Sequence, residues 1–355
     1  MTATAPTQSK GLMRTLFEPP AVGKMATGTK LVVYGLLLAW TLFVLFPIYW
    51  LLITSLKGPA EVNSGPFYVP FVDFQPTLQA WKDLLIIDYE DTLRAYTNSI
   101  IISLTSTALS VLIGSMAAYA LARVSFKPNL ITILIFVAAM IGCFVGIGIY
   151  GVDWRLTLAS ATAIFFFLAY AIGKRVKVPL GNGDILFWII SQRILAPVVV
   201  VVPIYMMFQT VRLLDTHLAI ILTYAVVNLP IVVWLMYDFF SSIPKDLEES
   251  AQLDGATMIM TFREIVLPLS KAGLAATTLL VMILSWNEYL FALFLSTAKA
   301  QTMPILVAAM NAGERGILWW TMSAVIVVMI IPVVLLAVAL QRFISKGILM
   351  GAVKG

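Results

Sequence analysis

The chain has 355 residues, of which 61% are hydrophobic and only 12% are charged. Ordinary soluble domains carry about 25% charged residues, so this composition excludes a water-soluble domain and indicates a polytopic membrane protein. The formal net charge is +5, but the basic residues are scattered and flank apolar segments, which favours a role in membrane orientation over nucleic-acid binding.

Residues 1–30 contain four basic residues and no short apolar core followed by a cleavage site, so they are predicted to form a cytoplasmic tail. A membrane-spanning helix needs about 20 mostly apolar residues. About eight later segments meet this requirement: Leu31–Ile53, Tyr96–Ala122, Ile131–Tyr150, Leu156–Gly173, Trp188–Thr210, Leu218–Phe240, Ala272–Thr297 and Ile317–Leu340. Lysine and arginine are concentrated on the loops that share a side with the N-terminus, which predicts that both termini are cytoplasmic.

The loop after the first segment and an arginine in the fifth segment are placed relative to the membrane as follows. Residues 54–95, with Trp81, four prolines and the acids Asp88, Glu90 and Asp91, are predicted to form a structured loop on the outer, periplasmic side. Arg193, in the fifth segment, is predicted to lie near the inner surface, where its long side chain reaches the lipid headgroups.

Residues 241–270 form a polar interruption between two apolar segments. Ser241 or Ser242 is a candidate cap, Pro244 suits a first helical turn, and the acids that follow suit the positive end of a helix. We predict a helix that ends at Asp254, a left-handed turn at Gly255, and a second helical piece from Ala256 to about Pro268. Such an element suits docking on a soluble partner, and a purely structural loop is the alternative.

One motif in this interruption carries a resemblance. Glu249-Ser250-Ala251, three residues, Gly255, nine residues, Ile265, one residue and Leu267-Pro268 resemble the EAA loop of binding-protein-dependent ABC importer permeases, with Ser250 as the only departure. Further segments resemble the maltose-type second permease of the carbohydrate branch: Ala117–Phe126, Pro203–Thr216, Ser242–Ala256, Ser285–Leu293 and Gln341–Gly355.

The resemblance covers residues 31–355 except 128–184. Relatives usually have six spans, so the two apolar segments in 128–184 are expected to be an additional hairpin at the periphery. Two added spans leave the EAA loop on its original side of the membrane.

The resemblance implies an all-α transmembrane bundle with the type I importer permease fold, and a bacterial inner-membrane location. It implies three partners: a second permease in a heterodimer, an ATPase dimer and an extracytoplasmic solute-binding protein. The cargo would be a sugar or polyol. This chain has no G-x4-G-K-[ST] phosphate loop, so ATP and magnesium are expected on the partner ATPase and no cofactor on this chain.

The same resemblance implies which residues couple the chain to the ATPase. The expected ATPase-coupling residues are Glu248, Glu249, Ser250, Ala251, Asp254, Gly255, Ile265, Leu267 and Pro268. The cytoplasmic tail, residues 341–355, is expected to reach the ATPase through Gly351, Ala352, Val353, Lys354 and Gly355.

Few polar residues lie within the spans. The candidates for a substrate path are Trp286, Asn287, Glu288, Asn228, Tyr224 and Gln209. A carboxylate at this depth is a functional hypothesis by default, but Glu288 can equally pair with a neighbouring helix.

Two other function classes are alternatives. An ion-coupled secondary transporter would use Glu288 as its coupling carboxylate. A membrane-embedded enzyme would need a cluster of histidine, aspartate or cysteine, whereas the chain has one cysteine, Cys143, and one histidine, His217. We therefore predict no catalytic residue, no disulfide within the chain and no metal site, with His217 at the boundary of a span.

Overall fold

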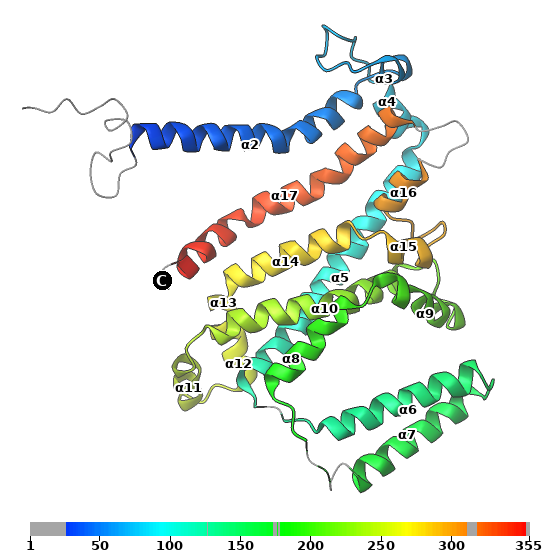
Figure 1. Ribbon diagram of the computed structural model, residues 1–355, viewed down its shortest axis with the longest axis vertical. Coiled ribbons are helices and arrows are strands. Elements are labelled where there is room, and N and C mark those ends of the chain that lie inside the picture. The colour runs from blue at the N-terminus through cyan, green and yellow to red at the C-terminus, as the bar shows by residue number, and fades with distance from the viewer. Residues whose placement is uncertain (1–25, 126, 173–175, 177, 311–317, 353–355) are drawn as a thin grey trace, which may run out of the picture. The chain divides into compact units, whose positions relative to one another are not determined.

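The computed structural model describes residues 26–125, 127–172, 176, 178–310 and 318–352 (Figure 1). The described residues form helices joined by turns. No β-strand is present among them, and their only β-type pairing is in isolated bridges. The all-α prediction is therefore confirmed. The chain divides into two compact units: Met1–Tyr89 with Ala309–Val328, and Glu90–Ala308 with Met329–Gly355.

Within the described residues, six helices are long and apolar enough to cross a membrane. They are α2 (Thr27–Thr54), α5 (Tyr89–Arg123), α6 (Leu130–Gly148), α7 (Trp154–Ala171), α10 (His217–Ser241) and α17 (Trp319–Ala352). Two bent helix pairs, Asn182–Ile194 with Pro197–Thr210 and Met258–Leu269 with Lys271–Trp286, would bring the number to 8. The span count expected from the sequence is thus within the range that the structure allows.

Two of the predicted spans are broken. The segment predicted as Trp188–Thr210 consists of α8 (Asn182–Ser191), a short 3-10 turn and α9 (Pro197–Thr210), and the two halves bend by 89°. Proline is tolerated in the first turn of a helix, where its missing N–H is not needed, so Pro197 starts α9.

The second broken span is the one predicted as Ala272–Thr297. It stops at the end of α14 (Lys271–Trp286), and a short helix, α15 (Leu290–Leu295), follows after three residues. The carboxylate of Glu288 accepts hydrogen bonds from the backbone N–H groups of Phe291 and Ala292, so it caps the new helix.

The first unit contains a folded loop after α2. It includes α3 (Pro59–Ser64), α4 (Gln79–Lys82) and a π-helical turn at Asp83–Ile87. The buried Lys57 donates from Nζ to the Phe67 carbonyl at 2.6 Å, and its ammonium lies 4.6 Å from the centre of the Trp50 ring. These contacts hold the start of the loop, from Trp50 to Phe67, together.

Helix α10 is central to the core of the second unit. Its Ile220 and Tyr224 pack in one hydrophobic cluster with α9 and α15, and its Met236 and Phe240 pack in another with α5 and α14. A Cβ on Gly273 of α14 would lie 2.3 Å from the Phe239 ring. Glycine at this position therefore permits the close approach of α14 to α10.

Helices α6 and α7 pack against each other as a hairpin (Figure 1). Two backbone hydrogen bonds close the neck of the hairpin: Leu130 N to the Val178 carbonyl, and Leu180 N to the Pro128 carbonyl, both 2.9 Å. The two ends of the segment predicted as an insertion are therefore adjacent.

Candidate functional site

The segment that resembles an EAA loop contains two helical pieces at a fixed turn. The first is α11 (Asp246–Leu253), and the next is α12 (Met258–Thr261), which Thr257 caps by accepting a hydrogen bond from the Met260 N–H. Gly255 lies between them with a φ of +88°, a conformation that other residues adopt at a cost. The predicted left-handed turn is confirmed.

Two details of that prediction were wrong. Helix α11 begins at Asp246 after Lys245, so neither Ser241 nor Ser242 caps it. Those serines belong to the end of α10, whose hydrogen bonding continues through Ser241. The second piece begins at Met258, passes through a π-helical turn at Phe262–Val266, and ends in α13 (Leu267–Leu269).

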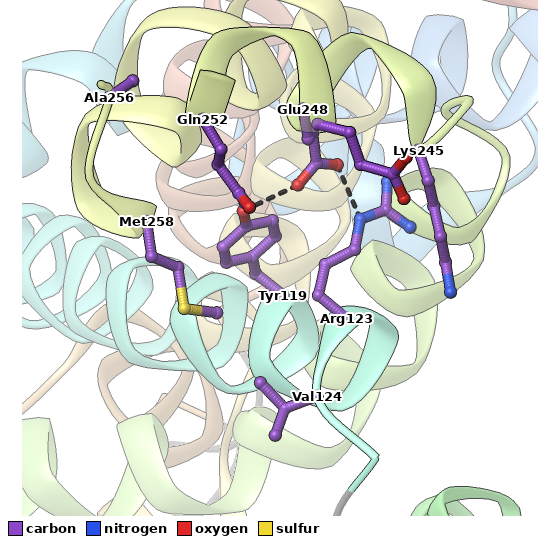
Figure 2. Close-up of a pocket in the computed structure, with 9 residues that line it drawn as sticks. Tyr119, Arg123, Val124, Lys245, Glu248, Gln252, Ala256 and Met258 are labelled. Carbon is purple, nitrogen blue, oxygen red and sulfur yellow. Dashed lines mark hydrogen bonds and ion pairs between the residues drawn. The ribbon is translucent and has the colours of Figure 1, made fainter. Parts of the chain in front are cut away.

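Glu248 connects α11 to the end of α5, as Figure 2 shows. Its Oε1 accepts a hydrogen bond from Arg123 Nε at 2.6 Å, and its Oε2 accepts one from the Tyr119 hydroxyl at 2.7 Å. The side chains of Arg123 and Glu248 are only 9% and 5% exposed. We call this buried trio the lock.

The same guanidinium also reaches α10. Arg123 Nη2 donates to the carbonyls of Phe240 and Ile243, at 2.9 and 3.1 Å. Carbonyls at a helix end have no partner within the helix, so a side-chain donor is needed to satisfy them. Arg123 therefore joins the ends of α5 and α10 to α11, and removing one charge of such a buried pair costs about 3–5 kcal/mol.

The lock shows how Glu248 is placed within the chain. The sequence predicted it as an ATPase-coupling residue, and its carboxylate is buried and engaged with α5. The other residues of the motif are placed differently: Glu249, Ser250, Asp254, Gly255 and Pro268 are exposed, and Ala251, Ile265 and Leu267 are half-buried.

Apolar side chains are also exposed on this element. Leu253 is 90% exposed and Ile259 is 78% exposed. A pocket of about 620 Å³ on this element is lined by residues that include Tyr119, Arg123 and Gln252 (Figure 2). Exposed apolar groups beside acidic ones are typical of a protein-interaction surface.

The residues proposed for a substrate path mostly join helices to one another. Asn228 Nδ2 donates to Ser285 Oγ at 3.0 Å, and the Tyr224 hydroxyl donates to the Glu288 carbonyl at 3.2 Å. Trp286 Nε1 donates to the Met329 carbonyl at 3.0 Å. Asn287 and Gln209 have exposed side chains.

Arg193 lies within the broken span. It lies in the turn between α8 and α9, its side chain is exposed, and its Nη1 donates to the carbonyl of Val227 in α10 at 3.1 Å. The sequence predicted one continuous helix here, whereas the structure breaks it at this turn.

His217 and Asp215 lie at the start of α10, the boundary that the sequence predicted. His217 Nε2 lies 2.7 Å from Asn98 Oδ1. Burial disfavours the charged form of Asp215, but four backbone N–H groups of residues 297–300 donate to the carboxylate and lower its pKa to about 2. Among the described residues, no cluster of three or more histidine, cysteine or acidic residues could hold a metal ion.

Sequence reasoning missed Tyr119 and Arg123. The available signal was a basic residue at the end of a span within the quoted segment Ala117–Phe126, but a partner on α11 is far away along the chain. Of the predicted tail contacts, Gly351 and Ala352 end α17, whereas Val353, Lys354 and Gly355 lie outside the described residues.

Comparison with known proteins identifies the family. Residues 110–350 match the family described as "Binding-protein-dependent transport system inner membrane component". The chain is 31% identical to the sulfoquinovosyl glycerol transport system permease protein SmoH of Agrobacterium fabrum, over 88% of this chain and 89% of that protein. It is also 31% identical to the trehalose/maltose transport system permease protein MalG of Thermococcus litoralis, over 88% of this chain and 92% of that protein.

A solved structure shares the fold. A chain of a bacterial ABC transporter involved in the import of the acidic polysaccharide alginate superposes with a TM-score of 0.57 at 21% identity, over 88% of this chain and 95% of that chain. These relatives give no support to an ion-coupled transporter. The chain belongs to the family of binding-protein-dependent transport system inner membrane components: it is a multi-pass inner-membrane permease subunit of an ABC importer, and not an enzyme.

Proposed function

We propose that this chain forms, with a second permease, a heterodimer that carries a sugar or polyol into the cytoplasm. The names of SmoH, a sulfoquinovosyl glycerol transport permease, and MalG, a trehalose/maltose transport permease, support this cargo class. An extracytoplasmic solute-binding protein delivers the cargo, and the two permeases alternate between inward-facing and outward-facing states. Both termini lie in the cytoplasm.

The element at 241–270 docks in a groove of a separate ATPase dimer, which binds ATP and magnesium. The observation that carries this proposal is the division of α11 into two faces. Glu248 ties one face to α5, while Leu253 is 90% exposed and Glu249 and Asp254 are also exposed beside it. A partner that covers these groups gains apolar contact and charge pairing, and the lock passes its motion to the spans.

The proposal also covers the turn at Gly255, the C-terminal tail and the substrate path. Gly255 reverses the chain so that both helical pieces fit one groove. The tail residues 351–355 contact the ATPases. Asn287 and Gln209, whose side chains are exposed, are the stronger path candidates, because the side chains of Trp286, Asn228 and Tyr224 join helices and the Glu288 carboxylate caps α15.

Two substitutions test the docking. Glu249→Lys reverses an exposed charge on α11, and Gly255→Pro forbids the positive φ of the turn. Each is expected to abolish ATP-driven uptake by the purified importer, with its ATPase and binding protein, in proteoliposomes. Glu264→Lys is the matched control, since Glu264 is an exposed acid of the same segment at an unspecified position of the motif, between Gly255 and Ile265.

The level of the variants in the membrane is measured alongside uptake, so that loss of transport is not confused with loss of protein. If both variant complexes hydrolyse ATP in response to loaded binding protein as well as wild type does, the docking assignment is wrong. Uptake that survives without the ATPase and collapses with an ionophore would instead establish an ion-coupled transporter.

A further inference from the structure

The break between α8 and α9 carries a charge. Arg193 lies in the three-residue 3-10 turn Gln192–Ile194 that follows α8, and α9 starts only at Pro197. The side chain is exposed and its one hydrogen bond within the described residues runs from Nη1 to the Val227 carbonyl, at 3.1 Å. A guanidinium has five N–H donors, so several are left for another partner.

The position of the Val227 carbonyl along α10 gives the depth of the Arg193 guanidinium. Helix α10 has 25 residues, from His217 to Ser241. At 1.5 Å per residue, Val227 lies about 15 Å from the His217 end and about 21 Å from the Ser241 end. The hydrocarbon core of a bilayer is about 30 Å thick. The guanidinium therefore lies close to the middle of the span.

Two independent features disfavour a position of Arg193 against lipid tails. A charged side chain at the bilayer centre is costly, so such residues face a water-filled cavity or a protein partner. Non-helical backbone at this depth is likewise tolerated only where it is buried in protein or lines such a cavity. The 3-10 turn and the Arg193 guanidinium lie at the same place, so both are expected to face protein or a water-filled cavity.

The charge of Arg193 has no counter-ion in the described chain. Ion pairs among the described residues join Arg94 to Asp91 and Arg123 to Glu248. No described carboxylate oxygen lies within 4.0 Å of the Arg193 guanidinium. A guanidinium matches the geometry of a carboxylate, sulfonate or phosphate group through paired hydrogen bonds.

We propose that Arg193 places a fixed positive charge on the wall of the cargo path and selects a sugar or polyol that bears a carboxylate, sulfonate or phosphate group. This inference rests on the proposed function, because it assumes that the two permeases enclose an aqueous path. The hydrogen bond to Val227 holds the guanidinium in place, and the free donors bind the passing anion.

The test needs no knowledge of the cargo. Cys143 is the only cysteine of the chain, so a Cys143→Ala background leaves no thiol here. Ile194, 81% exposed and next to Arg193, is changed to cysteine in that background. The assembled importer is treated with two methanethiosulfonates, one bearing a sulfonate and one bearing a trimethylammonium group, and labelling rates at position 194 are measured by mass spectrometry.

The ratio of the two rates is divided by the ratio for free 2-mercaptoethanol, which removes the intrinsic difference between the reagents. We expect this normalised ratio to favour the sulfonate and to fall at least about tenfold in Arg193→Gln, as for the loss of one well-formed charge contact. Arg193→Lys should preserve it. Arg155→Gln, which removes an exposed charge at the start of α7, should leave it unchanged.

A position that neither reagent reaches in the assembled importer would overturn the inference, because lipid or the second permease would then cover it. A normalised ratio near one in the presence of Arg193 would overturn it too, even if the Arg193→Gln variant failed to assemble. ATP-driven uptake is measured separately. If uptake depends on ATP while the ratio shows no preference, this inference fails and the proposed function stands.

Discussion

At the scale of single residues, the lock is the feature with the largest expected energy. Arg123→Met leaves the Glu248 carboxylate buried without its counter-charge, and Glu248→Gln does the reverse. Each is expected to cost about 3–5 kcal/mol. The double variant should cost clearly less than the sum, because neither charge is then stranded. Thermal unfolding of the purified chain in detergent measures the two single variants and the double variant, with the exposed Glu264→Gln as control. Additive losses would mean that the pair does not act as a unit.

Asp215 gives a pH-dependent prediction at the same scale. Its pKa of about 2 in the folded protein is below the ordinary value of 3.8. A lowered folded-state pKa adds stability that is complete above the unfolded-state pKa and is lost as pH falls through the folded-state value.

Asp215→Asn should therefore lower the unfolding midpoint at pH 6, with a cost of about 1–3 kcal/mol for hydrogen bonds to a charged group. The difference from wild type should shrink as pH falls from about 4 to about 2. Thermal scans across this range check it, and a difference that does not change with pH would contradict the account.

Residue-scale contacts were the least predictable from the sequence. Arg123 and Glu248 are separated by 125 positions, and a single sequence does not show which distant charges meet. Glu249 and Glu248 are adjacent acids, yet one is exposed and the other is buried, because only the position of α11 against α5 distinguishes them. Gly255 was predictable, since its role depends on local backbone conformation alone.

At the scale of helices, close packing depends on small residues. The Cβ of an alanine at position 273 would lie 2.3 Å from the Phe239 ring, so α14 would have to move from α10. Gly273→Ala is expected to cost about 1–3 kcal/mol from overpacking. Gly142→Ala on α6 is the control, because its Cβ would meet no atom within 4 Å. Unfolding midpoints that shift equally in the two variants would show that the close contact is not what matters.

Helix positions followed from apolar length, but helix breaks did not. Pro197 starts a helix, whereas Pro203 lies inside the same helix, and composition alone does not separate these two outcomes. The break at residues 287–289 depends on Glu288 capping α15, a contact that a hydropathy pattern cannot contain. The break at Arg193 has the same origin.

At the scale of the whole molecule, the class and family followed from composition and from the EAA spacing, because both are properties of the sequence itself. The added hairpin was recognised only as a departure from the usual number of spans. Its closed neck, with two hydrogen bonds of 2.9 Å between residues 128–130 and 178–180, explains how it fits into the chain.

The neck leads to a prediction on the intact importer. Replacing residues 131–177 by a short glycine linker should leave ATP-driven uptake in proteoliposomes, because the ends that remain are already hydrogen-bonded to each other. A linker of the same length inserted at the neck without deletion is the control for local disturbance. Loss of the second permease from the purified complex would show instead that the hairpin is part of the subunit interface.

Arg123 bonds at once to α11 and to the end of α10, from its own place on α5. Both spans are therefore attached to α11 through one guanidinium. Under the proposed docking, a displacement of α11 by the ATPase moves the two spans together. Gating of the pore should be stepwise, with one full transition for each productive closure of the nucleotide-binding partners.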